Sequence, residues 1–203
     1  MLSVAVTGNV ASGKSTVVRF FERWGARVTD ADAIVRQLQS PGTPVFDAIV
    51  ARFGAGVVGA DGALDRVALR TLVLADPAAR RDLNAIVHPA VGARRAELEA
   101  EARLQGVSIL VHDIPLLFEA ADPGRFDLVV LVEAPPALCR DRLIRFRELT
   151  PDVADRLMAT QLPQETKRAR SHFVIVNDGD LVALELRARQ VWQGIEAAAA
   201  ERA

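Results

Sequence analysis

The chain has 203 residues, of which 50% are hydrophobic and 25% are charged. This composition predicts a soluble globular protein of one domain, or of one domain with an inserted lobe. The formal net charge of −1 gives no excess of positive charge for nucleic acid or an anionic membrane, so we expect neither as a partner.

The chain opens with the pattern of a strand, a glycine loop, a helix and a second strand. Leu2 to Val6 is a short apolar run that predicts a buried strand, and its lack of a basic start argues against a signal peptide. Apolar residues follow at helical spacing from Lys14 to Trp24, and Gly25 is suited to end that helix. Ala26 to Thr29 completes a βαβ unit.

Residues 32–105 have a mostly helical pattern. It is interrupted by SPGTP at Ser40 to Pro44 and by a glycine-rich loop from Gly54 to Gly62. Asp76-Pro77 fits a helix start. We expect His88-Pro89 to break or restart a helix, because the residue before a proline avoids the α region. The region is interpreted as a helical insertion lobe.

The α/β alternation then resumes. Val107 to His112 and Phe126 to Val132 are continuous apolar runs, as in strands buried on both faces of a parallel sheet. Helices are predicted from Pro136, Thr150-Pro151 and Asp180, and Phe173 to Val176 is the last strand. The predicted fold class is therefore α/β, with five parallel strands and helices on both sides. No apolar run approaches the ~18 residues of a membrane span.

The strongest motif is Gly8-Asn9-Val10-Ala11-Ser12-Gly13-Lys14-Ser15, followed by Thr16, which matches G-x-x-x-x-G-K-[ST]. Its glycines let backbone amides turn toward phosphates, and the following helix adds its positive N-terminal end. Lys14 brings a full charge to the β and γ phosphates, and the Ser15 hydroxyl suits a magnesium shell. The motif predicts ATP binding with Mg²⁺ through Gly8, Ala11, Ser12, Gly13, Lys14, Ser15 and Thr16.

The motif alone does not separate a kinase from a nucleotide switch. Neither the NKxD nor the DxxG string of GTP-binding switches occurs in the chain, which favours a kinase and leaves a non-catalytic nucleotide-binding regulator as the alternative. A kinase needs a base, and Asp30-Ala31-Asp32 follows the second strand, where open α/β sheets place ligands. A helix N-cap explains either aspartate equally well.

Basic residues gather between about residues 140 and 170. They are Arg140, Arg142, Arg145 and Arg147, then Lys167, Arg168 and Arg170. Guanidinium groups bind phosphate oxygens, so these residues suit a lid over a transferring phosphoryl group. An ordinary solvated helix face is the alternative for each of them.

The order and spacing of several further segments resemble the dephospho-coenzyme A kinase family over nearly the whole chain. They are VTGNVASGKSTV, WGARVTDADAIVR, SPGTP, LNAIVHPAV, IPLLFE, ATQLPQETK and VIVNDG. The resemblance implies a P-loop core (1–32, 106–139 and 171–203), a helical substrate lobe (about 33–105) and a small lid (about 140–170). It implies transfer of the ATP γ-phosphoryl group to the ribose 3′-hydroxyl of dephospho-coenzyme A, the last step of coenzyme A synthesis, with another small-molecule or nucleoside kinase as the alternative.

The resemblance also implies roles for single residues. Asp32 matches the family's catalytic aspartate, Arg36 closes the same segment, and Arg142 matches a basic lid position. Asn177 and Gly179 match the turn near the adenine, and His88, Leu116 and Leu117 match positions near the acceptor. Packing beside Pro89 is the alternative for His88, and core packing for the two leucines. A cytoplasmic location agrees with the single cysteine, Cys139, which excludes an intrachain disulfide.

The chain departs from the family pattern in two places. Phe146 stands where the family often has an arginine, between Arg145 and Arg147. The arginine that grips phosphate is therefore either displaced by one position or supplied by Arg142 alone. Ser171-His172 replaces an Ala-Asp pair before the last strand, which argues against an acid acting there. Asp113 lies where a second carboxylate ligand of a magnesium ion would sit. A role in the magnesium shell and no role there are equally open for this residue.

Overall fold

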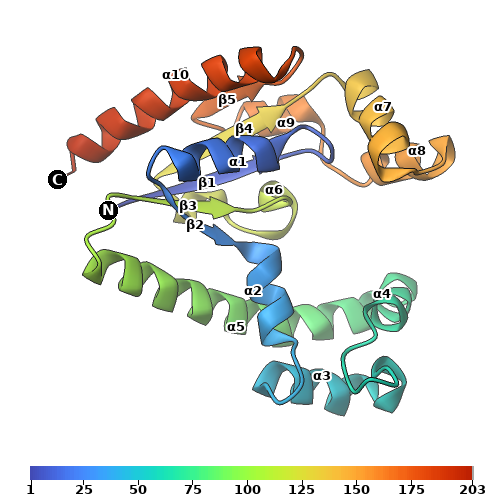
Figure 1. The fold of residues 1–203 in the computed structure, drawn as a ribbon. Coiled ribbons are helices and arrows are strands. Elements are labelled where there is room, and N and C mark those ends of the chain that lie inside the picture. The colour runs from blue at the N-terminus through green and yellow to red at the C-terminus, as the bar shows by residue number, and fades with distance from the viewer. Residues whose placement is uncertain (203) are drawn as a thin grey trace. The chain divides into compact units, whose positions relative to one another are not determined.

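The computed structural model describes residues 1–202. They form two compact units, one of Met1–Thr29 and the chain from Ala102 onward, the other of Asp30–Glu101. The first unit contains the sheet and is called the core unit here. The second is called the helical unit, and Figure 1 shows its helices.

The core unit is built on a five-stranded parallel sheet with the order β2-β3-β1-β4-β5 (Figure 1). Its strands are β1 (Leu2–Gly8), β2 (Arg27–Asp30), β3 (Ile109–Asp113), β4 (Leu128–Glu133) and β5 (Phe173–Val176). The predicted fold class is confirmed. Val6 pairs with Asp113 and Gly8 with Val132, so the carboxyl ends of three strands meet at one edge. This edge is where parallel sheets place ligands.

The helices of the core unit follow the strands in alternation. They are α1 (Lys14–Arg23), α6 (Leu117–Ala120), α7 (Pro136–Arg147), α8 (Pro151–Ala159), α9 (Gln164–Arg168) and α10 (Leu181–Ala200), with a 3₁₀ turn at Pro123–Arg125. The predicted helix ends agree closely. Trp24 is the C-cap of α1, Gly25 has φ 110°, and the Asp180 side chain caps α10 by accepting from the Ala183 amide at 2.8 Å.

Apolar side chains cover the sheet in two clusters. One cluster joins α1 and α10 to β1, β3, β4 and β5, and its largest members are Phe21 and Trp192, whose ring centroids lie 5.3 Å apart. The other contains Ala5, Leu117, Phe118, Phe126 and Val129. The strand members of both sets come from the continuous apolar runs that predicted the strands, because a strand covered on both faces has no solvent side.

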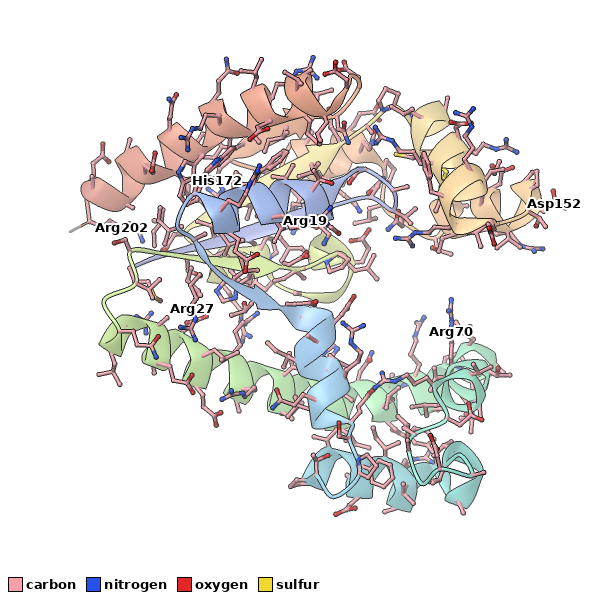
Figure 2. The ribbon with its side chains drawn as sticks, in the orientation of Figure 1. Arg19, Arg27, Arg70, Asp152, His172 and Arg202 are labelled. Atoms are coloured by element: carbon pink, nitrogen blue, oxygen red, sulfur yellow. The ribbon has the colours of Figure 1, made fainter. Side chains whose placement is uncertain are left out.

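Polar contacts fix the ends of the outer elements of this unit. The Arg202 guanidinium, labelled in Figure 2, lies 2.5 Å from the Asp127 carboxylate, which also accepts from the Ser3 amide at 2.8 Å. His172 accepts a hydrogen bond from the Val129 amide at 3.0 Å. The Ser171-His172 departure therefore has a structural role beside β5.

The helical unit has its own core. It consists of α2 (Ala31–Leu38), α3 (Pro44–Phe53), a 3₁₀ turn (Ala55–Val57), α4 (Arg66–Ala75) and most of α5 (Pro77–Leu104). Ile49, Val57 and Leu69 are buried at its centre. Thr43 caps α3 and Asp65 caps α4, which gives sharp helix starts.

The predicted break at His88-Pro89 is wrong, because α5 continues through Pro89. A proline inside a helix removes one backbone hydrogen bond and crowds the preceding turn. Here Leu83 and Val87 before the proline and Val91 after it all pack into the same core cluster. Tertiary packing on both sides holds one helix where the local rule predicted two.

Within the described residues, no helix is long and apolar enough to span a membrane.

Candidate active site

The predicted phosphate-binding loop joins β1 to α1 at the carboxyl edge of the sheet. Lys14 is the first residue of α1, so the loop ends at the positive N-terminus of a helix. A Cβ on Gly8 would lie 2.3 Å from the Val132 carbonyl oxygen. Gly13 has φ 93°, and a Cβ there would lie 2.2 Å from the Asn177 amide nitrogen. Both positions therefore need glycine for steric reasons.

Ala11 is the strained residue of the loop. Its φ of 59° is left-handed, which costs a non-glycine residue roughly 1–2 kcal/mol. Neighbouring contacts hold it in place. The Ser12 amide donates to the Asn9 carbonyl at 3.1 Å, and the Ala11 carbonyl accepts from the Arg142 guanidinium at 3.1 Å. Strain of this kind is typical of functional loops.

Lys14, the residue expected at the β and γ phosphates, forms an ion pair with Asp113. The two side chains are only 11% and 15% exposed. Asp113 is the last residue of β3, directly opposite Val6 of β1. The arrangement holds a positive charge beside the loop in a partly desolvated place, where its field is stronger than in water.

The oxygen atoms at this edge fit magnesium. Ser15 is exposed at the start of α1, and the Asp113 carboxylate lies beside Lys14. Across the described residues there is no group of three or more His, Cys, Asp or Glu side chains that could hold a metal. A magnesium ion here would take most of its ligands from nucleotide phosphates and water, as this ion usually does.

The predicted adenine turn is tied to the loop. The Asn177 amide nitrogen of the side chain donates to the Ser12 carbonyl at 2.8 Å, and its backbone amide donates to the Glu133 carbonyl at 2.7 Å. Hydrogen bonding with Arg187 lowers the pKa of the neighbouring Asp178. Gly179 follows before α10, and a Cβ there would lie 3.2 Å from Ala183. Asn177 is thus held next to the end of the loop, and Gly179 lies beside the first turn of α10.

The predicted lid region contains α7, α8 and α9, and its arginines make different contacts. Arg142 reaches the Ala11 carbonyl and, at 3.5 Å, the Asn177 carbonyl. Arg140 binds Asp155 at 2.6 and 3.0 Å, which lowers the pKa of that carboxyl. Phe146 is 78% exposed. Of the residues predicted for phosphate, Arg142 is brought to the loop, while Arg140 braces the lid itself.

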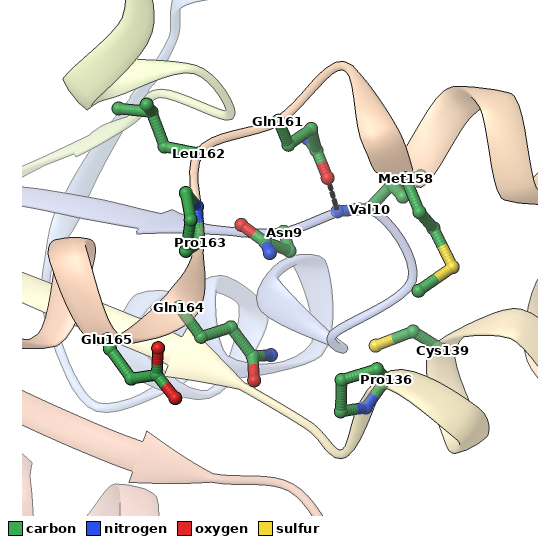
Figure 3. Close-up of a pocket in the computed structure, with 10 residues that line it drawn as sticks. All are labelled: Asn9, Val10, Pro136, Cys139, Met158, Gln161, Leu162, Pro163, Gln164 and Glu165. Carbon is green, nitrogen blue, oxygen red and sulfur yellow. Dashed lines mark hydrogen bonds between the residues drawn. The ribbon is translucent and has the colours of Figure 1, made fainter.

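Two further side chains also reach the loop, Gln161, which the sequence interpretation did not single out, and Lys167, one of the basic residues predicted for the lid. The Gln161 side chain accepts a hydrogen bond from the Val10 amide at 2.9 Å (Figure 3). Lys167 donates to Asn9 at 2.6 Å and pairs with Glu119 at 2.6 Å. A cavity of about 310 Å³ lies beside these contacts, with Asn9, Cys139 and Met158 in its lining (Figure 3). Burial raises the pKa of the Cys139 thiol.

The two predicted acceptor leucines differ in their surroundings. Leu117 is fully buried in a core cluster, whereas Leu116 is 43% exposed. Core packing therefore accounts for Leu117. Leu116 keeps surface available for a ligand.

Asp32, Arg36 and His88 belong to the helical unit. Asp30 caps α2 by accepting from the Ala33 amide at 3.0 Å, and Asp32 lies in the first turn with its side chain exposed. The cap is therefore supplied by Asp30. Arg36 lies 3.7 Å from the Asp30 carboxylate, and His88 is exposed on α5.

Comparisons with known proteins agree with the motif. A family model described as dephospho-CoA kinase matches residues 2–183. A dephospho-CoA kinase of Streptomyces avermitilis is 45% identical over 192 residues, covering 95% of this chain and 93% of the relative. One of Geobacter sulfurreducens is 42% identical over 190 residues, covering 93% and 96%.

Solved structures show the same fold. TT1252 from Thermus thermophilus superposes with a TM-score of 0.80 at 35% identity, covering 95% of this chain and 96% of that one. A dephospho-CoA kinase from Campylobacter jejuni gives 0.71 at 23% identity, with the same coverage. With a phosphate-binding loop at the carboxyl edge of a parallel sheet and relatives matched over both units, the chain belongs to the dephospho-CoA kinase family.

Proposed function

We propose that this protein is an ATP-dependent dephospho-CoA kinase, which transfers the γ-phosphoryl group of ATP to the ribose 3′-hydroxyl of dephospho-coenzyme A. The observation that carries the proposal is the match to relatives of that name over 95% of the chain. Such a match includes the helical unit as well as the phosphate-binding loop. The loop alone supports a phosphotransferase, and the family membership supports the acceptor.

The mechanism that we propose is direct in-line transfer with no phospho-enzyme. Lys14 and the amides of the loop hold the phosphates, and the charge on Lys14 stabilises the negative charge that develops during transfer. Arg142 is placed to add positive charge near Ala11. Asp32 orients the 3′-hydroxyl or accepts its proton, and the resemblance of its segment supports this role.

Further residues are assigned to the ligands. Ser15 would hold Mg²⁺, with Asp113, which is paired with Lys14, as a second candidate ligand, and the ion supplies charge neutralisation to the phosphates when it is bound. Asn177 and Gly179 are assigned to the turn beside the adenine of ATP. Arg36, His88 and Leu116 are assigned to the acceptor. The use of ATP and the presence of a single cysteine, Cys139, support a cytoplasmic location.

A panel of acceptors tests the proposal. Each of dephospho-coenzyme A, AMP, adenosine and shikimate is incubated with ATP, with and without Mg²⁺, and ADP release is followed by a coupled assay. We expect dephospho-coenzyme A to be phosphorylated far better than the others, only with Mg²⁺. Phosphorus NMR of the product should show the new phosphate on the ribose 3′-oxygen. Comparable turnover with AMP, or a phosphate elsewhere, would reject the acceptor and leave a kinase of another small molecule.

A further inference from the structure

We propose that Glu119, Gln161 and Lys167 act as positioning residues for ATP, because together they hold Asn9 and Val10, in the first half of the phosphate-binding loop, in their phosphate-binding shape. These three side chains are called the loop brace here. They come from α6, from the segment between α8 and α9, and from α9. The inference rests on the proposed function only through its use of ATP.

Lys167 is the centre of the brace. Its side chain is fully buried, and its ammonium lies 2.6 Å from the Asn9 side-chain oxygen and 2.6 Å from Glu119. Removing a charge from water is expensive, and apolar residues often stabilise a fold as well as a buried ion pair does. A buried lysine that donates to the Asn9 side chain therefore indicates that Asn9 must be held in a fixed position.

Gln161 acts on the next residue of the loop. Its side-chain oxygen accepts from the Val10 amide at 2.9 Å, as Figure 3 shows. The following residue, Leu162, donates its amide to Glu119 at 3.1 Å. Glu119 thus binds both Lys167 and the chain that carries Gln161. The two contacts to the loop share one anchor in α6.

The strain at Ala11 gives the loop a reason to need this support. Ala11 is left-handed and is not glycine, so its conformation persists only while its neighbours hold it. The brace fixes Asn9 and Val10 on one side, and Arg142 binds the Ala11 carbonyl itself. Without the brace we expect the loop to relax, turning its amides away from the phosphates.

Gln161→Met tests this without introducing a charge, since methionine has a similar size but accepts hydrogen bonds poorly. Gln164→Met is the matched control. Gln164 lines the same cavity, but its side chain donates to the Ala134 carbonyl at 2.6 Å and not to the loop. Binding of ATP is measured by calorimetry without acceptor, and the KM values for ATP and for dephospho-coenzyme A are measured separately.

We expect Gln161→Met to weaken ATP binding by about three- to tenfold, the usual size of one lost hydrogen bond. The KM for the acceptor and the melting temperature should change little. Gln164→Met should bind ATP as the unchanged protein does. Equal ATP affinity in Gln161→Met and the unchanged protein would overturn the proposal, and so would an equal loss in both variants.

The buried pair has its own test, because Lys167→Met alone leaves the Glu119 carboxylate buried without its cation and can unfold the chain. The double variant Glu119→Gln with Lys167→Met removes both charges. It should recover most of the melting temperature but not the ATP affinity. Recovery of both would show a purely structural pair. If the unchanged protein binds ATP but does not phosphorylate dephospho-coenzyme A, the proposed acceptor is rejected and the comparison of ATP affinities still decides the role of the brace.

Discussion

The Lys14 ammonium forms an ion pair with the Asp113 carboxylate, across the carboxyl ends of β1 and β3. The parallel register sets this contact, because Asp113 lies opposite Val6, two residues before the loop begins at Gly8. The lysine of the loop is thus held at the sheet edge by a residue about 100 positions away in the chain. Both partners belong to the core unit.

Removal of the Lys14 charge should abolish phosphoryl transfer while leaving the fold intact. We expect Lys14→Ala to lower kcat by about 10²-fold or more, because a charge aimed at the transferring group acts mainly in the transition state. The measurement is steady-state turnover with dephospho-coenzyme A. Arg19→Ala is the control, since Arg19 is exposed on the same helix (Figure 2). Near-normal turnover by folded Lys14→Ala would show that the loop does not hold the phosphates.

A methyl group should have opposite effects at two glycines. At Gly8 it would meet the Val132 carbonyl at 2.3 Å, so we expect Gly8→Ala to lower the free energy of unfolding by about 1–3 kcal/mol and to impair ATP binding. At Gly92, inside α5, no atom lies within 4 Å of the added carbon apart from its chain neighbours and the nearby backbone of its own helix. Gly92→Ala should raise the free energy of unfolding by about 0.5–1 kcal/mol.

Urea unfolding of both variants, with ATP titration, checks this pair. Gly92→Ala is also the control for the ATP titration, because it should bind ATP as the unchanged protein does. A stable Gly8→Ala with normal ATP affinity would contradict the close approach of the loop to β4.

The sequence predicted the elements whose signals are local. The apolar runs of β1, β3 and β4 and the glycine motif before Lys14 all lie within short windows, and the structure agrees with them. Strand starts were less accurate, since β3 begins at Ile109 where Val107 was expected. Pro89 shows the limit of a local rule, because packing on both of its sides overrides it.

The loop brace could not be predicted in this way. Lys167 follows acidic and polar residues and has the pattern of a solvated helix face, yet its side chain is fully buried. Its partner Asn9 is 158 positions away, so only the tertiary fold brings the two together. Two signals in the sequence pointed to this region: the basic residues Lys167, Arg168 and Arg170, and the segment ATQLPQETK of the family resemblance, which contains both Gln161 and Lys167.

The free energy of unfolding should depend on pH through Asp127. Burial alone would raise the pKa of Asp127, but the hydrogen bond from the Ser3 amide and the Arg202 guanidinium outweigh it and hold the pKa below its usual range. A carboxyl with a lowered pKa stabilises the fold above its unfolded pKa, about 3.9, and loses that contribution as the pH falls further.

We therefore expect Asp127→Asn to lower the free energy of unfolding by about 1 kcal/mol at pH 7. The difference from the unchanged protein should shrink below about pH 4. Urea unfolding at pH 7 and pH 3 measures this. Glu22→Gln, an exposed site on α1, is the control. A difference of the same size at both values would mean that the charge of Asp127 does not contribute.

The two aspartates that flank Ala31 should separate a helix cap from a catalytic group. Asp30 caps α2 through the Ala33 amide, and asparagine caps a helix about as well as aspartate, so Asp30→Asn should change turnover by no more than a few-fold. Asp32 lies in the first turn with an exposed side chain. Asp32→Asn keeps its shape and removes the charge, so we expect kcat to fall by about 10²-fold with ATP affinity unchanged.

The pair is measured by steady-state kinetics and by ATP titration under the same conditions. Each variant is the control for the other, because both replace an aspartate by its amide within the same turn of chain. The reverse ranking of the two variants would move the catalytic role to Asp30. Equal small effects would reduce Asp32 to a surface residue of α2 and leave the acceptor hydroxyl to be activated by the phosphate itself.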